Sequence, residues 1–466
     1  MRTWDTLLNA NRLRDTNKNP KDERSEFQRD YDRIIFSSSF RRLQDKAQVY
    51  PLEKYDYVRT RLTHSLEASS LGRSFGTDVA IKLLKEKKVE KNYVESFSNI
   101  LSSVSLIHDI GNPPFGHCGE KIIQSWFKVW IKNNSNKTQN FSLSEKLDFL
   151  EFEGNAQALR ILTKLQFLKD KYGLNLTLAS LASLIKYPYS SGEAFAIEDD
   201  NIDRIKTRKK DGAKFKKFGY FQSEKEQFDI INKETNLNNL RHPLAYLLEA
   251  SDDIAYSAAD LEDGHKKKSI EFELILTKFK KILGTEHQLV KDFETAHSES
   301  LDSGFPDPED LTMQKVRILV QSKLMRDCID TFVNNYNSIM SGCYQNSLIN
   351  GNAESKEIFK LLTEDIGVNY IYNDKDVLLL ELVGNKVISG LLDIFVPAAI
   401  SSEFGDLRSI LGKYYHFISP NFKFIMNNYT VGNTYNKLQL VTDFICGMTD
   451  FYALDLYQKL SGFKLM

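Results

Sequence analysis

Residues 100–120 read ILSSVSLIHDIGNPPFGHCGE, a stretch in which an apolar helical pattern ends at polar residues. Apolar side chains recur every three to four positions through residues 100–107, which predicts a helix with one buried face. The helix is expected to stop at Gly111, where glycine can adopt a left-handed cap and the prolines that follow cannot continue the helix. The adjacent His108 and Asp109 are therefore predicted to lie at a helix end.

Two other segments have the same helical period and carry polar residues on it. Residues 62–83 predict a helix with His64 in its first turn. Residues 244–262 predict a second, in which three polar residues are spaced four apart and therefore share one face. These three residues are Asp252, Tyr256 and Asp260. A polar stripe on an otherwise apolar helix is expected to face a polar ligand.

The rest of the chain favours an all-α fold, because strict two-residue alternation is scarce. Residues 1–265 hold all the candidate site residues, and residues 266–466 return to helical patterning. We expect the second region to pack on the first and to contribute to oligomer contacts. Residues 190–217 are hydrophilic, and residues 204–217 include 8 Lys/Arg among 14 positions. Such a composition does not bury, so this segment is interpreted as a basic surface loop or lid.

Composition limits the classes of protein to which the chain can belong. Hydrophobic residues make up 41% and aromatic residues 12%, which is typical of a globular body. The net charge of -1 predicts no general attraction to nucleic acid or acidic membranes. Four cysteines without a close CxxC spacing fit a reducing cytoplasm. The N-terminus lacks the pattern of a signal peptide, and no apolar stretch approaches membrane-spanning length. We expect a cytoplasmic protein with no membrane partner.

Two histidines and two aspartates of these segments form a candidate metal-ligand set. A mixture of nitrogen and oxygen donors suits manganese, iron or another divalent cation of borderline hardness. Alternatives to metal binding stay open. An isolated histidine is more often a core or surface residue, and the adjacent Asp252 and Asp253 can form an exposed charged face. The candidate ligands are His64, His108, Asp109 and Asp252.

A second pair, His117 and Glu120, lies three residues apart in the same glycine-rich stretch. If the chain turns helical after Pro114, the carboxylate can accept a hydrogen bond from the imidazole, which is the geometry of a general acid or base. A surface ion pair is the alternative. The candidate phosphate ligands are Arg61, Lys186 and Lys217, each of which could instead be a solvated side chain.

Taken together, these motifs resemble the bacterial deoxyguanosine triphosphate triphosphohydrolases of the HD-domain superfamily. The matching blocks run in family order over most of the chain, and their joint specificity is far higher than that of one His-Asp pair. The blocks are residues 40–49 (FRRLQDKAQV), 59–67 (RTRLTHSLE), 108–120 (HDIGNPPFGHCGE), 152–157 (FEGNAQ), 249–256 (EASDDIAY), 447–450 (GMTD) and 452–453 (YA).

The resemblance implies an HD-domain helical core with an extended C-terminal helical region. It implies a divalent metal, Mn²⁺ or Fe²⁺, on the four candidate ligands, and Mg²⁺ or Mn²⁺ with the triphosphate. It also implies a catalytic His117 supported by Glu120, with the metal polarising the α-phosphate of dGTP or another dNTP. Deoxynucleoside and tripolyphosphate would be the products, and the enzyme would be a ring-shaped homo-oligomer, often a hexamer. The implied substrate contacts are Gln48, Val49, Arg61, Asn155, Lys186, Lys217, Tyr256 and Asp260.

Two other functions remain open at this point. Another HD-domain phosphohydrolase, such as a nucleotidase or cyclic-nucleotide phosphodiesterase, would share the four metal ligands but release different products. A nucleic-acid-binding regulatory protein with a vestigial HD site is the second alternative, suggested by the basic run at residues 204–217, with single-stranded nucleic acid as the partner. The complete ligand set argues against the second alternative.

Overall fold

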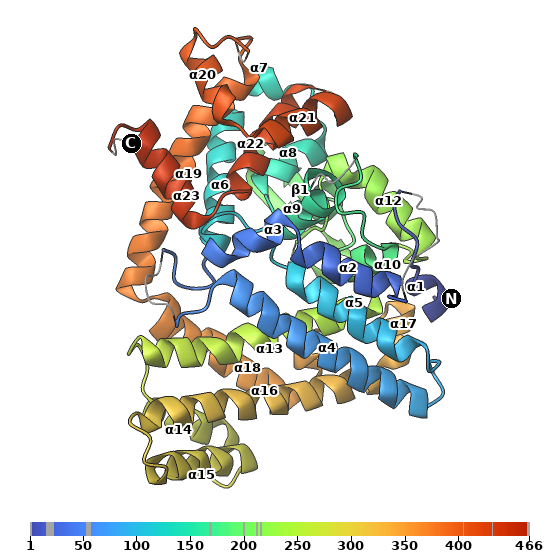
Figure 1. The fold of residues 1–466 in the computed structure, drawn as a ribbon, viewed down its shortest axis with the longest axis vertical. Coiled ribbons are helices and arrows are strands. Elements are labelled where there is room, and N and C mark those ends of the chain that lie inside the picture. Colours follow the sequence, from blue (N-terminus) through green and yellow to red (C-terminus); the bar gives the residue numbers. More distant parts are fainter. Residues whose placement is uncertain are drawn as a thin grey trace.

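The computed structural model describes residues 2–14, 23–52, 57–166, 170–198, 201–210, 213–214, 217–403, 405–430 and 432–463. Within these ranges the chain is almost entirely helical, and strands occur only as two short hairpins. The predicted all-α class is confirmed. Figure 1 shows the C-terminal helices α19 to α23 at one end of the molecule, with α14 and α15 at the opposite end.

Four long helices build the centre of the molecule. They are α4 (Arg61–Lys85), α5 (Tyr93–Ile107), α13 (Pro243–Lys266) and α16 (Pro308–Asn334). Helix α4 packs along both α5 and α13, and α13 packs against α16, an arrangement visible in the lower half of Figure 1. The first turn of α4 is fixed by a capping box, in which Thr60 and Thr63 exchange hydrogen bonds. This cap sets the position of the turn that carries His64.

The remaining elements surround this centre, and their bounds are as follows. Before α13 the helices are α1 (Trp4–Leu7), α2 (Glu26–Ile35), α3 (Ser38–Arg41), α6 (Gly116–Asn133), α7 (Ser135–Thr138), α8 (Leu143–Leu150), α9 (Gly154–Arg160), α10 (Leu178–Leu184), α11 (Ser191–Ala194) and α12 (Lys225–Glu234). After α13 they are α14 (Phe272–Leu283), α15 (Gln288–Asp302), α17 (Tyr336–Ser341), α18 (Ala353–Lys360), α19 (Lys375–Ile400), α20 (Ile410–Phe417), α21 (Pro420–Tyr429), α22 (Thr434–Cys446) and α23 (Asp450–Leu460). Short 3-10 helices are η1 (Arg42–Asp45), η3 (Gln222–Glu224) and η4 (Ile349–Gly351), and π-helices are η2 (Ile161–Leu165) and η5 (Leu361–Tyr372).

Two hydrophobic cores meet in the molecule. The larger lies around α4, α5, α13 and α16, and the second lies among α6, α8, α19 and α22. Helix α19 packs on α6, and η5 packs on α13, so residues beyond 266 contact the segments that carry the predicted site directly. The expected packing of the C-terminal region on the core is present, while a domain boundary at residue 265 stays a prediction.

Residues 190–217 differ from the expected irregular loop. Strand β1 (Phe195–Glu198) pairs antiparallel with β2 (Asn201–Thr207), and β3 (Lys209–Lys210) pairs with β4 (Ala213–Lys214). Ile197 lies opposite Ile205, and both pack against the second core, while charged residues of β2 face outward. The partly buried residues of β2, Ile202 and Ile205, lie three positions apart, so no two-residue alternation marks this strand in the sequence. Residues 211–212 and 215–216 of the basic run lie outside the described residues, and its role as a lid stays a prediction.

Gly111 does not form the left-handed helix cap that the sequence predicted. Helix α5 ends at Ile107, and Gly111 is absent from the residues with positive φ, so no left-handed cap forms there. A Cβ at Gly111 would instead lie 2.1 Å from the carbonyl oxygen of Gly154 and 2.3 Å from the amide nitrogen of Ala158. Glycine is required because the backbone of α9 passes directly over it.

Among the helices in the described ranges, none combines the length and the apolar character that crossing a membrane requires.

Candidate active site

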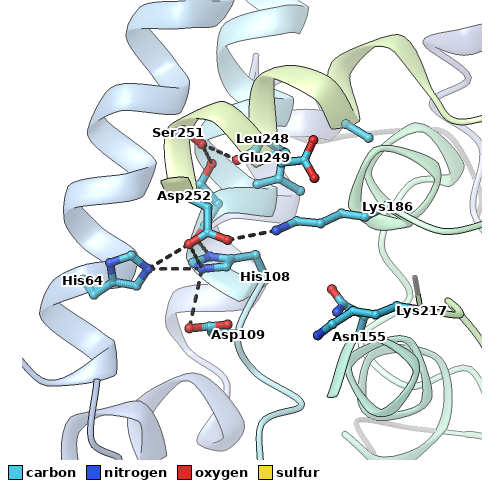
Figure 2. Close-up of polar contacts among 12 residues, drawn as sticks. His64, His108, Asp109, Asn155, Lys186, Lys217, Leu248, Glu249, Ser251 and Asp252 are labelled. Atoms are coloured by element: carbon cyan, nitrogen blue, oxygen red, sulfur yellow. Dashed lines mark hydrogen bonds and ion pairs between the residues drawn. The ribbon is translucent and has the colours of Figure 1, made fainter. Parts of the chain in front are cut away.

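The four predicted metal ligands come from α4, from the turn that follows α5 and from α13, and they converge on one point, as Figure 2 shows. His64 Nε2 lies 3.2 Å from His108 Nε2, and Asp252 Oδ1 lies 3.2 Å from the first and 3.1 Å from the second. Asp109 Oδ2 is 3.6 Å from His108 Nε2. His64, His108 and Asp109 each offer a ligand atom within 4.8 Å of the other two. The structure therefore brings together all four side chains.

This donor set fits a divalent cation. Two ligand atoms at right angles around an ion with bonds of roughly 2.1 Å lie about 3.0 Å apart, close to the spacing of the two imidazole nitrogens and the Asp252 oxygen. His108 Nδ1 lies 2.7 Å from the carbonyl oxygen of Ser105. Because that contact places the ring proton on Nδ1, Nε2 keeps its lone pair for a metal.

Other side chains of the protein hold both carboxylates. Asp252 Oδ2 accepts a hydrogen bond of 2.9 Å from Lys186 Nζ. Asp109 Oδ2 pairs with the Arg61 guanidinium, and its Oδ1 accepts a hydrogen bond of 2.8 Å from Asn112 Nδ2. These contacts orient both carboxylates toward the imidazoles, as outer-shell partners of metal ligands commonly do.

The cations around the cluster keep its carboxylates ionised. Burial acts to raise the pKa of Asp109, but nearby positive charge, that of Arg61 foremost, outweighs it, and the pKa lies below its usual range. Burial acts in the same direction on Asp252, where nearby positive charge, that of Lys186 foremost, outweighs it and holds the pKa well below its usual range. Both side chains therefore offer charged oxygens at neutral pH.

His117 and Glu120 form the expected pair at the start of α6. His117 Nδ1 lies 2.9 Å from Glu120 Oε2, and Glu120 Oε1 accepts a hydrogen bond of 2.8 Å from the amide of Gly154. Burial acts to raise the pKa of Glu120, but the hydrogen bond with His117 outweighs it, so the pKa is lowered. The imidazole is 70% exposed and the carboxylate only 9%. The buried Glu120 carboxylate thus holds the Nδ1 edge of the accessible His117 ring.

A cavity of about 480 Å³ opens beside the cluster. Its wall includes all eight predicted substrate contacts together with His108, Asp109, Asp252 and His117, whereas His64 and Glu120 are not part of the wall. Three cationic side chains, Arg61, Lys186 and Lys217, face it. Five carboxylate residues face it too, namely Asp109, Asp252, Asp253, Asp260 and Glu381. An anionic ligand would enter this cavity most readily together with a divalent cation.

Two predicted substrate contacts, Asn155 and Lys217, share one carboxylate that was not predicted from the sequence. Glu153 Oε1 accepts hydrogen bonds of 2.6 Å from Asn155 Nδ2 and 3.1 Å from Lys217 Nζ. Figure 2 shows Asn155 and Lys217 close to each other, apart from the metal ligands. Glu153 is buried and precedes α9 as its N-terminal cap. The position of Glu153 within residues 152–157 was the available signal.

Tyr372 contacts the part of the wall formed by Tyr256 and Asp260. Asp260 Oδ2 accepts a hydrogen bond of 2.6 Å from the hydroxyl of Tyr372, the last residue of η5. Burial raises the pKa of Asp260 to about 7, although this hydrogen bond acts to lower it. Asp260 therefore changes its charge near neutral pH.

Other residues of the cavity wall were not predicted from the sequence. Tyr372 and Thr363 come from a π-helix about a hundred residues beyond α13, and nothing in their local pattern marks them. Asn112 could have been found, because it lies between His108 and His117. The remaining unassigned wall residues are Ala47, Pro51, Phe115, Gly116, Cys118, Tyr187, Asp253, Val377 and Glu381.

Comparisons with known proteins identify the family. No family model matches the chain. A deoxyguanosinetriphosphate triphosphohydrolase-like protein of Listeria innocua is 41% identical and is aligned over 98% of this chain and 99% of its own length. A protein of the same description from Synechocystis is 34% identical over 99% of this chain and 100% of its own. The deoxyguanosinetriphosphate triphosphohydrolase of Yersinia enterocolitica is 30% identical over 93% of each chain. Full-length similarity of this degree, together with the His/Asp cluster, places the chain in the deoxyguanosinetriphosphate triphosphohydrolase family.

Proposed function

We propose that this protein hydrolyses dGTP, and other dNTPs that fit the same cavity, to deoxynucleoside and inorganic tripolyphosphate. The observation that carries the proposal is the convergence of two imidazoles and two carboxylates beside a cavity whose wall also holds three cations and His117, which pairs with Glu120. The similarity over 93% of the chain to a protein named as a deoxyguanosinetriphosphate triphosphohydrolase, and over 98% to a protein named as like one, supports it.

A divalent cation held by His64, His108, Asp109 and Asp252, with Mn²⁺ or Fe²⁺ the best chemical match, would supply Lewis-acid polarisation of the α-phosphate. The three cationic side chains bind the triphosphate. Lys186 uses one N–H on Asp252 and Lys217 one on Glu153, so each ammonium keeps donors for phosphate oxygens. Mg²⁺ or Mn²⁺ accompanies the triphosphate and offsets the carboxylates of the wall.

His117 carries the proton transfer. Because Nδ1 is directed at Glu120, Nε2 is the atom that exchanges a proton with the attacking water or with the 5'-oxygen. Water adds to the α-phosphorus, the bond from phosphorus to the 5'-oxygen breaks, and the 5'-oxygen leaves as a hydroxyl. Glu120 stabilises the protonated imidazole between these steps.

The sugar lies against the wall formed by Gln48, Val49, Tyr256 and Asp260. An aromatic ring packed beneath the deoxyribose excludes a 2'-hydroxyl, so ribonucleotides are poor substrates in this proposal. Asn155 contacts the phosphates beside Lys217. A cytoplasmic location and assembly into a homo-oligomer, with a hexamer as the expected form, remain predictions.

The test is to incubate the purified protein with each of the four dNTPs and with GTP, in the presence of Mn²⁺ or Mg²⁺, and to identify products by phosphorus NMR. Deoxyguanosine plus intact tripolyphosphate, with GTP spared, is the expected result. His117→Ala should abolish turnover while metal content persists, and His416→Ala, an exposed histidine of α20, serves as the matched control. Release of orthophosphate or pyrophosphate would point to another HD-domain reaction and contradict the proposal.

A further inference from the structure

Asp450, the first residue of α23, reaches two segments that carry predicted site residues. Its Oδ1 accepts a hydrogen bond of 3.0 Å from the amide of Phe115, and its Oδ2 accepts one of 3.0 Å from the amide of Ala47. The side chain is buried, with 1% of the residue exposed. One carboxylate from the C-terminal helices therefore holds the chain two residues before His117 and one residue before Gln48.

A buried lysine connects the same region by donating hydrogen bonds to carbonyl oxygens, whereas Asp450 accepts them from amides. Lys46 Nζ donates hydrogen bonds of 2.6 Å to the carbonyl oxygen of Asn112 and of 2.7 Å to that of Cys446. Asp450 and Lys46 thus use side-chain charges to satisfy backbone groups at residues 46–47, 112–115 and the end of α22. Since charge-assisted hydrogen bonds in a buried site are strong and directional, the segments are fixed relative to one another.

The segment before His117 needs such support. Phe115 has φ 61° and Gly116 has φ 56°, so two successive residues lie in the left-handed region. For a bulky residue such as phenylalanine this conformation is strained and persists only where its surroundings impose it. The bond from the Phe115 amide to Asp450 lies at this point. A Cβ on Gly116 would lie 2.5 Å from Arg61 Nη2, so the turn has little room to move.

We propose that Asp450 is a positioning residue for the reaction, which holds the strained turn at residues 115–116 so that His117 faces the substrate. Through it the C-terminal helices form part of the active site rather than an appended region. The inference rests on the proposed function, since it assigns Asp450 a role in that reaction.

The test compares Asp450→Asn with Asp455→Asn. Asparagine keeps one acceptor oxygen but presents an amide NH₂ to the second backbone N–H, so one of the two bonds is lost. Asp455 lies on the same helix and pairs with Lys459 at 2.8 Å, so its substitution removes the same charge without touching residues 46–47 or 115. We expect kcat for dGTP to fall roughly 10- to 100-fold in Asp450→Asn, and to stay within about twofold of the unchanged protein in Asp455→Asn, a range typical of exposed surface substitutions.

Two readouts separate positioning from general destabilisation. The losses in kcat from Asp450→Asn and Glu120→Gln should be clearly less than additive, because both act through His117. In the unsubstituted protein the peptide covering residues 113–119 should exchange its amide hydrogens slowly, and in Asp450→Asn it should exchange faster while the four metal ligands still bind Mn²⁺ at full stoichiometry.

Unchanged kcat in Asp450→Asn, or fully additive losses with Glu120→Gln, would overturn the inference while leaving the proposed function intact. Rapid exchange of residues 113–119 in the unsubstituted protein would overturn it as well, even if the variant failed to fold. An unsubstituted protein that does not hydrolyse any dNTP would instead count against the proposed function.

Discussion

Replacing Glu120 by glutamine should slow turnover without removing the metal. The side chain would keep its length, but it would lose the negative charge that faces His117 Nδ1 at 2.9 Å. Glutamine also offers only one acceptor oxygen, whereas Glu120 accepts from both His117 and the amide of Gly154. In the variant, either one of these two bonds is lost or the amide donates to His117 Nδ1, which places the ring proton on Nε2 and leaves that atom unable to accept one.

The size of the effect follows from the burial and charge of this contact. The Glu120 side chain is 9% exposed, so little water is available to replace the lost interaction. A hydrogen bond to a charged group contributes about 1.5–3 kcal/mol. If that difference appears in the transition state, where the imidazole carries a proton, kcat falls roughly 10- to 150-fold.

The assay is steady-state hydrolysis of dGTP by the metal-loaded protein, with metal content measured on the same sample. Glu151→Gln is the matched control, because Glu151 lies on the wall of a neighbouring cavity with His117 but has no hydrogen bond to it. A kcat for Glu120→Gln within about threefold of the unsubstituted protein, less than one hydrogen bond is worth, would refute the reasoning. So would a fall that is fully explained by lost metal.

Three further predictions follow from other contacts. Asp252→Asn weakens a ligand that lies within 3.2 Å of both imidazoles, so metal content after dialysis should fall sharply, and full stoichiometry would contradict the assignment. Burial raises the pKa of Asp260 to about 7. Between about pH 4 and pH 7 the folded protein therefore keeps a proton that the unfolded chain has released. Over this range Asp260 destabilises the fold progressively as the pH rises. Melting temperatures should show Asp260→Asn gaining on the unsubstituted protein over this range, and a constant difference would refute the shift. Gly111→Ala places a Cβ 2.1 Å from the Gly154 carbonyl oxygen and should lower the melting temperature markedly, as backbone overpacking costs about 1–3 kcal/mol or more; an unchanged melting temperature would contradict the close approach of α9.

Sequence patterns predicted the parts of the site that depend on local structure. Helical periodicity placed His64 in the first turn of a helix, His108 and Asp109 at a helix end, and Asp252, Tyr256 and Asp260 on one face, and the structure has all of these. The reason is that helix formation and its period depend on neighbours in the chain. The expected turn into a helix after Pro114 is also present, as α6.

Contacts between distant segments were not accessible in this way. Asp450 meets Phe115 across 335 positions, and Tyr372 meets Asp260 across 112, and no periodicity encodes either contact. The left-handed cap assigned to Gly111 was wrong for the same reason, since the steric demand comes from α9 and not from the local turn. The hairpin at residues 195–207 was missed because β2 is highly charged and its partly buried residues, Ile202 and Ile205, lie three positions apart, which is not the period of a strand.

The most direct test of the proposed reaction is hydrolysis of dGTP in water enriched in oxygen-18, with mass spectrometry of both products. Attack of water at the α-phosphorus places one labelled oxygen in the tripolyphosphate and none in the deoxyguanosine, and this is the predicted result. Label in the deoxyguanosine would show attack at the 5'-carbon, and labelled orthophosphate or pyrophosphate would show cleavage elsewhere in the triphosphate. Either outcome would contradict the roles assigned to His117 and the His/Asp cluster.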